Sequence, residues 1–168
     1  MKKIGAGGKL QNYDSKGRYC KNNYFDFTPP AFTKKEIRRQ KEEKRRQELY
    51  EKAKNSDDAY IFDVYLALEK VMPGVVVGVN EKMLDKNIGK PREFDIIAKK
   101  CIIEVKSGDV VNGEKQFFAQ LKYTKLHGLH HFIFAPDINR IRTYQYTKDG
   151  FDISKTLDEL IRKVKEIQ

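Results

Sequence analysis

The sequence has few cysteines and no long apolar run. Its two cysteines, Cys20 and Cys101, lie far apart in unlike surroundings, which argues against a disulfide framework or a cysteine metal cluster. No apolar stretch approaches the roughly 18 residues that a membrane span requires. Residues 1–3 lead into polar, glycine-rich sequence rather than into the apolar core of a signal peptide. These absences predict a cytosolic protein without a membrane span.

Basic charge is in excess, but it is unevenly distributed. The 168 residues include 34 Lys and Arg against 24 Asp and Glu, a net charge of +10, which suggests a polyanionic partner. Residues 1–54 carry 16 basic and 7 acidic side chains, whereas residues 55–168 carry 18 and 17. The length suits one domain with an appendage, and this shift in composition predicts a boundary near residue 55.

The basic first third divides into two segments. Residues 1–32 are rich in glycine and tyrosine and are predicted to be extended or looped. Thr33 and Glu36 form a capping-box pattern before a charged run that ends at Lys54, so residues 33–54 are predicted to be a helix or linker. Its few apolar residues indicate a helix that projects into solvent or lies on a partner. A solvated helix and a nucleic-acid contact both remain open.

Residues 55–168 alternate between helical and strand patterns, which predicts an α/β domain. The mixed central sheet is expected to have four or five strands, to be flanked by helices, and to follow the basic N-terminal arm and helix. We expect helices at 56–72, 113–126 and 153–167, and strands at 75–79, 93–98, 101–106 and 131–135, with a candidate strand at 142–146. Ser56 is expected to cap the first of these helices, and strands 93–98 and 101–106 to form a hairpin across residues 99–100.

The hairpin carries the most informative polar residues. Side chains alternate along a strand, so Glu104 and Lys106 share one face of strand 101–106. On the partner strand Phe94 and Ile96 are expected to point one way and Asp95 the other. If the hairpin closes as predicted, Asp95 lies near Glu104 on the same face.

Two neighbouring carboxylates repel each other unless something offsets their charge. Mg²⁺ does so with oxygen ligands, and it typically binds one or two carboxylates together with water and phosphate. Lys106 would then hold a water molecule or a phosphate oxygen. These are the components of metal-assisted phosphodiester hydrolysis. The simpler alternative is a Glu-Lys pair on an edge strand with an aspartate nearby by chance.

The wider pattern resembles the PD-(D/E)xK, or restriction-endonuclease-like, nuclease superfamily. Asp95 is followed after eight residues by Glu-Val-Lys and then Ser-Gly, and the order of predicted elements over residues 56–136 is similar as well. The stretch 115–120, Lys-Gln-Phe-Phe-Ala-Gln, resembles the glutamine-bearing helix of many members. One departure is Phe94, which replaces the proline of the nominal motif.

The resemblance implies a role for each matching residue. Asp95 and Glu104 would bind Mg²⁺ or Mn²⁺, with Zn²⁺ less favoured, and Lys106 would position or activate the attacking water. Gln120, or Gln116 one turn earlier, would contact metal-bound water or substrate. An acid on the first core helix would complete the site; the candidates there are Asp58, Glu69 and, less favoured, Asp57.

Three histidines form a weaker cluster. His127, His130 and His131 surround Gly128, and a pair three residues apart can bind zinc. They fall at a predicted helix end and strand start without an acidic or cysteine partner nearby in sequence. An exposed or helix-terminal role is therefore the favoured interpretation.

The N-terminal segment carries a second resemblance. The glycine- and tyrosine-containing residues 7–14 and 17–19, followed by a charged linker and a nuclease-like module, look like the C-terminal part of bacterial polymorphic toxins, including those of contact-dependent inhibition. This implies a fragment of a longer protein, an effector that cuts DNA or, less favoured, tRNA in a target cell's cytoplasm, and a cognate immunity protein. Alternatives are a housekeeping or phage nuclease for DNA repair, junction resolution or restriction, and a catalytically inactive nucleic-acid-binding module.

Overall fold

The computed structural model describes residues 2–4, 10–12, 33–84, 91–107 and 114–168. The chain forms two compact units, residues 1–38 and 39–168. In the first unit β1 (Lys2–Ile4) pairs antiparallel with β2 (Leu10–Asn12). Most of the glycine- and tyrosine-containing segment, including residues 17–19, lies outside the described residues, as does Gly108 of the Ser-Gly pair.

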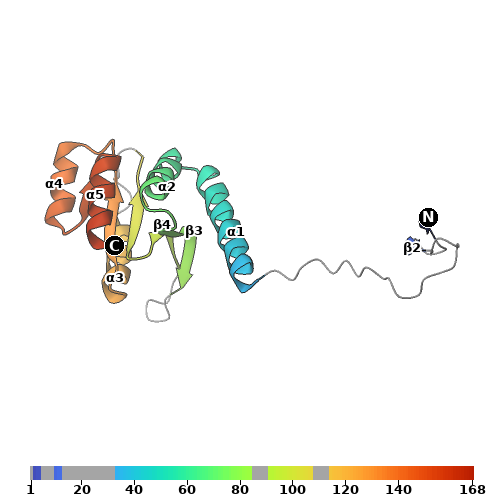
Figure 1. Cartoon of the computed structure of the whole chain (residues 1–168). Coiled ribbons are helices and arrows are strands. Elements are labelled where there is room, and N and C mark those ends of the chain that lie inside the picture. Colours follow the sequence, from blue (N-terminus) through green and yellow to red (C-terminus); the bar gives the residue numbers. More distant parts are fainter. Residues whose placement is uncertain (1, 5–9, 13–32, 85–90, 108–113) are drawn as a thin grey trace. The chain divides into compact units, whose positions relative to one another are not determined.

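A mixed five-stranded sheet forms the centre of the second unit, in the order β3-β4-β5-β6-β7. The first three strands, β3 (Val76–Leu84), β4 (Pro91–Ala98) and β5 (Cys101–Val105), are antiparallel neighbours. Two parallel strands follow, β6 (His130–Phe134) and β7 (Asp152–Ser154). The fold is therefore α/β with a mixed sheet, as the sequence predicted (Figure 1).

The β4–β5 hairpin closes where the sequence pattern placed it. Ile96 pairs with Ile103 and Ile97 with Ile102, which leaves Lys99 and Lys100 as the two-residue turn. Continued by one residue, an ideal ladder would set Asp95 opposite Glu104, but regular pairing of β4 with β5 ends at Ile96 and Ile103. The two acidic positions lie on neighbouring strands in the middle of the sheet.

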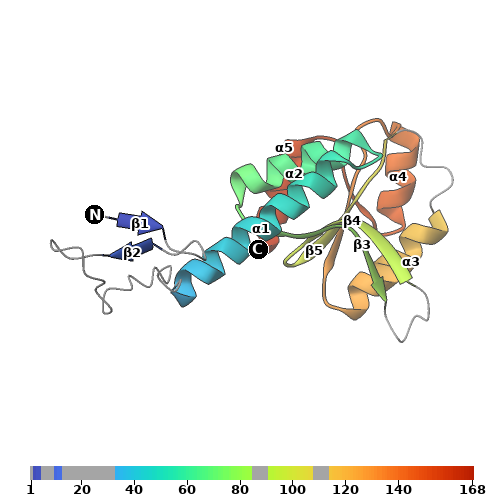
Figure 2. The same ribbon diagram turned by 90° about the vertical axis from the view of Figure 1, so that its right-hand side faces the viewer.

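Helices cover both faces of the sheet (Figure 2). On one face α2 (Ala59–Val71) and α5 (Leu157–Ile167) bury their apolar stripes against β3 to β6. On the other face α3 (Glu114–Leu126) packs over β4, β5 and β6 through Tyr123 and Leu121. Within the described part of the chain no helix has the length and apolar composition needed to cross a membrane.

The charged helix α1 (Lys34–Lys54) begins with the predicted capping box, in which Thr33 N–H donates to Glu36 Oε2 (2.7 Å) and Glu36 N–H to Thr33 Oγ1 (3.2 Å). Its C-terminal part differs from expectation, because Leu49 and Ala53 are buried in the same core as α2 and α5. The compact unit accordingly begins at Arg39 rather than near residue 55. Two apolar residues one turn apart are enough to dock this end.

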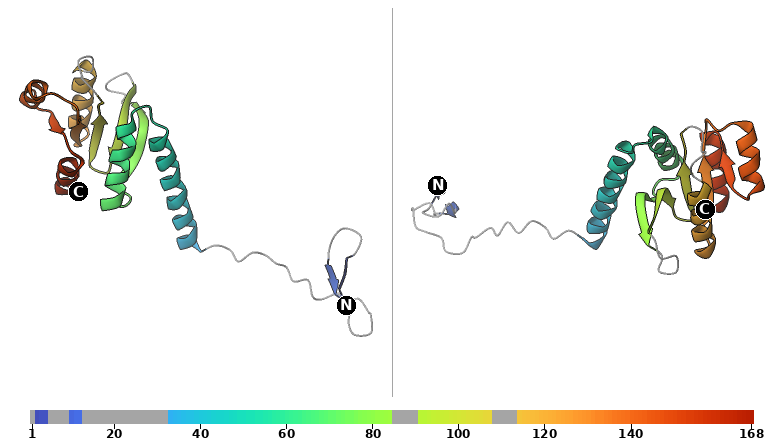
Figure 3. Two further views of the ribbon diagram at one scale, coloured as in Figure 1. Left: turned by 90° about the horizontal axis from the view of Figure 1, so that it is seen from above. Right: turned by 180° about the vertical axis from the view of Figure 1, so that it is seen from behind.

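Three local predictions were wrong. Residues 142–146 lie in helix α4 (Arg140–Lys148), where Asn139 accepts a hydrogen bond from Arg142 N–H as N-cap; α4 lies on the β7 side of the sheet and α1 on the β3 side (Figure 3). Ile153 belongs to β7, because Thr156 caps α5 three residues later. The cap of α2 is Asp58 rather than Ser56.

Candidate active site

Asp95 lies where β4 departs from regular pairing with β5. The next rung of the antiparallel ladder would pair Val105 N–H with the backbone of β4, but this N–H donates to Asp95 Oδ2 at 2.7 Å. Phe94 and Ile96, expected on one face, lie in different hydrophobic clusters: Phe94 packs with Tyr123 of α3, whereas Ile96 packs in the core with α2 and α5. The Asp95 carboxylate is thus held at the end of β5 by a backbone hydrogen bond.

Lys106 lies next to both acids of the motif. Its Nζ is 3.8 Å from Asp95 Oδ2 and 3.6 Å from Glu104 Oε2. The backbone keeps it there, because β5 ends at Val105 and Lys106 N–H donates to Phe134 O of β6 at 2.9 Å. The three side chains become progressively less exposed from Lys106 (27%) through Asp95 (19%) to Glu104 (0%). The sequence-predicted triplet is therefore one cluster.

Burial dominates the electrostatics of the two carboxyls. Burial, reinforced by the negative charge of Asp95, raises the pKa of Glu104 to about 8, although Lys106 opposes the change. Burial also raises the pKa of Asp95, against the opposing effects of Lys106 and of the Val105 N–H. The Gln120 side chain and the Asp95 backbone act on the pKa of Glu104 in the opposite direction, although neither oxygen of Glu104 has a partner within ordinary hydrogen-bond distance among the described residues. Such a carboxyl is protonated at neutral pH unless a cation compensates its charge.

The two glutamines of α3 occupy different environments. Gln120 is fully buried and donates from Nε2 to Glu93 O at 3.0 Å. Its Oε1 has no hydrogen-bond partner among the described residues, and the side chain lies close enough to Glu104 to lower that pKa. Gln116 is exposed. The structure therefore brings Gln120, and not Gln116, to the acidic cluster.

The structure also separates the candidate acids on the first core helix. Asp58 accepts from Tyr60 N–H through Oδ1 (2.9 Å), and from Ser107 N–H (3.1 Å) and Ser107 Oγ–H (2.8 Å) through Oδ2. Its charge contributes to the raised pKa of Asp95, so the two carboxylates are neighbours. At the other end of α2, Glu69 accepts from the N–H groups of Gly74 (2.9 Å) and Val76 (3.3 Å).

Glu69 thus accepts hydrogen bonds from the turn between α2 and β3 and lies away from the cluster. Asp58 caps a helix and binds the residue that follows Lys106. Both oxygens of Asp58 accept hydrogen bonds, so this carboxylate fixes the start of α2 and the residue that follows Lys106. A carboxylate has about four acceptor sites, so Asp58 can still offer a ligand.

A pocket of about 330 Å³ opens over this cluster. Its lining is unequal in charge, because four carboxylates face a single ammonium group; the lining residues are Asp57, Asp58, Ile61, Asn80, Glu93, Asp95, Val105, Lys106 and Ser107. Glu104 lies beneath this surface. The pocket is therefore an anionic opening with one lysine in its lining.

Sequence reasoning missed Asn80 as a pocket residue. Asn80 has a positive φ of 49°, and it donates from Nδ2 to Ser56 Oγ at 2.7 Å. Asparagine tolerates this conformation better than most residues, so an Asn directly after a β-branched run was the available signal. The predicted strand ended one residue earlier, at Val79, which hid it.

The donor set of the cluster fits a hard divalent cation. Both carboxyls offer oxygen, and the buried oxygens of Glu104 have no hydrogen-bond partner among the described residues, which is the condition that Mg²⁺ with one or two carboxylate ligands would satisfy. Across the described residues no group of three or more His, Cys, Asp and Glu side chains is arranged to hold a metal ion. The fit therefore rests on the carboxylate pair.

The three histidines do not converge. His131 is buried, and burial lowers its pKa to about 4. His130 and His127 are exposed, and the His127 ring lies against Tyr123. An exposed or helix-terminal role holds for two of them, whereas the third belongs to the interior.

Comparison with known proteins gives no match. No protein-family model matches this chain, and no curated protein or solved structure does so either.

Proposed function

We propose that this chain is a metal-dependent nuclease, with DNA slightly favoured over tRNA as substrate, built on a restriction-endonuclease-like core. The observation that carries the proposal is the position of Lys106 Nζ, within 4 Å of carboxylate oxygens from both Asp95 and Glu104. Together with the pocket above them, these residues supply the pair of carboxylates and the ammonium group that metal-assisted phosphodiester hydrolysis uses.

The charge of the pocket supports a requirement for metal. Four carboxylates line the opening against one ammonium group, and such a surface repels a phosphodiester. Asp95 and Glu104 are the residues that would hold Mg²⁺ or Mn²⁺. When bound, the cation would act as a Lewis acid toward the phosphoryl oxygen and offset the surplus negative charge.

The chain's own residues have separable tasks. The Lys106 ammonium group has three donors, and we assign to it the orientation of the attacking water or of a phosphate oxygen. Gln120 is anchored at Glu93 O and fixes the surroundings of Glu104. Asp58 positions the end of β5 through its two hydrogen bonds from Ser107.

The biological setting we propose is that of an antibacterial effector. Its support is the sequence resemblance of the N-terminal segment and the charged run to polymorphic toxins. The chain would act in the cytoplasm of a target bacterium and be neutralised by a cognate immunity protein. Expression in a bacterium tests this: toxicity that depends on Lys106 favours an effector, and harmless expression of an enzyme active in vitro favours a housekeeping or phage nuclease.

Nuclease activity is tested with plasmid DNA and with total tRNA, each incubated with Mg²⁺, Mn²⁺ or EDTA. We expect cleavage that EDTA abolishes and that Lys106→Ala and Asp95→Asn reduce by at least a hundredfold. Lys70→Ala is the matched control, since Lys70 is exposed in the last turn of α2, and it should cleave normally. No cleavage of either substrate, or equal cleavage by Lys106→Ala, would contradict the proposal.

A further inference from the structure

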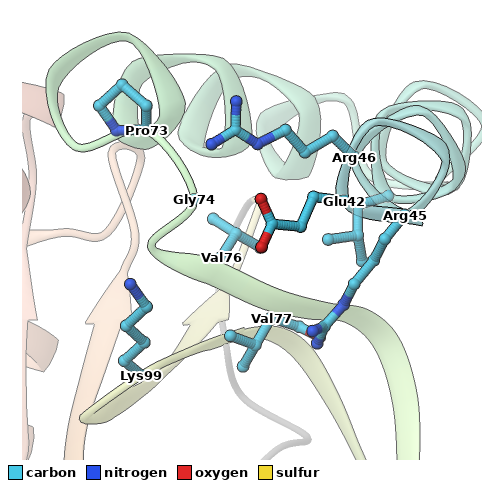
Figure 4. A pocket seen from close by; sticks show the side chains of 9 residues that line it. Glu42, Arg45, Arg46, Pro73, Gly74, Val76, Val77 and Lys99 are labelled. Carbon is cyan, nitrogen blue, oxygen red and sulfur yellow. The ribbon is translucent and has the colours of Figure 1, made fainter. Parts of the chain in front are cut away.

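A groove lies between α1 and β3, away from the candidate active site. It consists of two adjoining hollows of about 320 and 430 Å³, which share Arg45, Leu49 and Val77 in their linings. Figure 4 shows the first hollow, with Glu42, Arg45 and Arg46 contributed by α1 and Lys99 entering from the β4–β5 turn. The groove is therefore built from α1, the α2–β3 turn, β3 and the β4–β5 hairpin.

Cations outnumber carboxylates along this groove. The linings contain five basic side chains, Arg45, Arg46, Lys52, Lys82 and Lys99, and three acidic ones, Glu42, Glu48 and Glu81. Lys52 is paired with Glu81, and Arg45 donates from Nη2 to Val77 O at 2.8 Å. Within the described part of the chain, the side chains of Arg46 and Lys99 have no ion pair. These two cations are available to an anionic ligand.

One ion pair joins the lining of the groove to the lining of the active-site pocket. Lys82 of the groove lining forms an ion pair of 3.6 Å with Glu93, which lines the pocket. The groove extends along α1 from Glu42 to Lys52, which at the rise of a helix is about 15 Å. One strand of duplex DNA advances about 3.4 Å per nucleotide along the helix axis, so this length accommodates roughly four nucleotides.

We propose that the α1–β3 groove binds the phosphate backbone of a nucleic acid and guides the strand to the active-site pocket. This inference rests on the proposed nuclease function. The pocket is lined mainly by carboxylates, so it contributes repulsion to a polyanion before metal binds. The attraction has to come from another surface, and the groove supplies it through Arg46 and Lys99, which line its first hollow.

The test measures binding in EDTA, where no cleavage occurs. A fluorescein-labelled DNA duplex of about 20 base pairs is titrated with the full chain, and anisotropy gives the Kd at several salt concentrations; unfractionated tRNA serves as a competitor. The variant Arg46→Gln/Lys99→Gln removes two groove cations. Its control, Arg39→Gln/Lys44→Gln, removes the same charge from exposed positions of α1 outside the groove.

We expect the groove variant to weaken binding roughly tenfold per cation near 0.1 M salt and to reduce the slope of log K against log salt by about 2, since each phosphate contact contributes about 0.9 to that slope. The control should change both quantities by less than half as much. Equal thermal midpoints for the three proteins would show that folding is unaffected.

Two results would overturn the inference. Unchanged affinity and salt slope in the groove variant would assign the groove to another ligand, such as an acidic protein. An equal loss of affinity in the control variant would show that the effect comes from the total charge of the chain and not from the groove. The two proposals can be contradicted separately. A chain that binds DNA through the groove but cleaves neither substrate contradicts the proposed nuclease activity alone. A chain that cleaves but binds DNA independently of the groove contradicts the proposed role of the groove alone.

Discussion

Replacing Glu104 with glutamine should stabilise the metal-free protein, and increasingly so as pH rises. Burial and the charge of Asp95 raise the pKa of Glu104 from 4.5 to about 8 in the folded protein. Between these values the folded chain retains a proton that the unfolded chain has released. The free energy of unfolding of the wild type therefore falls as pH increases through this window, and the loss is complete above about pH 8.

The size of the effect follows from the same pKa. Each tenfold change in proton affinity is worth about 1.4 kcal/mol, so the change from 4.5 to about 8 sets an upper limit of roughly 5 kcal/mol. Asp95 and Glu104 interact closely enough to share their titration, and we therefore expect about 3 kcal/mol. This is a large fraction of the 5–15 kcal/mol that typically stabilises a folded domain.

The assay is urea unfolding in EDTA at pH 5, 7 and 9. Glu104→Gln resembles the protonated carboxyl in shape, so it should exceed the wild type by less than about 1 kcal/mol near pH 5 and by about 3 kcal/mol at pH 9. Glu166→Gln, at an exposed ion pair with Arg162, is the control and should change stability by less than about 0.5 kcal/mol at any pH. A difference between Glu104→Gln and the wild type that is independent of pH, or a variant less stable at pH 9, would refute the reasoning.

Three further predictions concern metal, the α2–β3 turn and α3. At pH 8, Mg²⁺ at about 100 times its Kd should stabilise the wild type by about 2.7 kcal/mol and Glu104→Gln by much less; equal stabilisation in urea unfolding would argue against a carboxylate site. Glu69→Ala should lower the free energy of unfolding by about 1–3 kcal/mol, because two N–H groups of the turn lose their acceptor. Cleavage per folded molecule should be normal, and a loss of cleavage would indicate that Glu69 belongs to the active site. Gln120→Leu should lower kcat at least tenfold, whereas Gln116→Ala should not, and equal kcat values for the two variants would contradict the placement of Gln120.

Local patterns predicted the centre of the sheet well. The alternation of β5, the two-residue turn at Lys99 and Lys100, and the apolar stripe of α2 each depend on residues close in sequence. These were sufficient to predict that Asp95 faces Glu104 across the hairpin. The candidate site follows from that register, so its central triplet was accessible without a structure.

Tertiary contacts decided what the patterns left open. A helical wheel gives the rotation of α2 but not which of its ends meets the strand ends, so Asp58 and Glu69 could not be separated by sequence alone. Residues 142–146 alternate in the manner of a strand, yet Asn139 caps a helix there. Leu49 and Ala53 were too few to predict burial, which depends on the surface that α2 and β3 present to them.

The position of α1 beside β3 also concerns solubility. β3 is an outer strand of the sheet, and an outer strand offers unpaired backbone groups to strands of other molecules. Two residues of α1 contact this strand, because Arg45 donates to the carbonyl of Val77 and Lys52 pairs with Glu81. The opposite outer strand, β7, is only three residues long. A chain shortened to begin at residue 55 would expose β3, and its edge would become a template for aggregation.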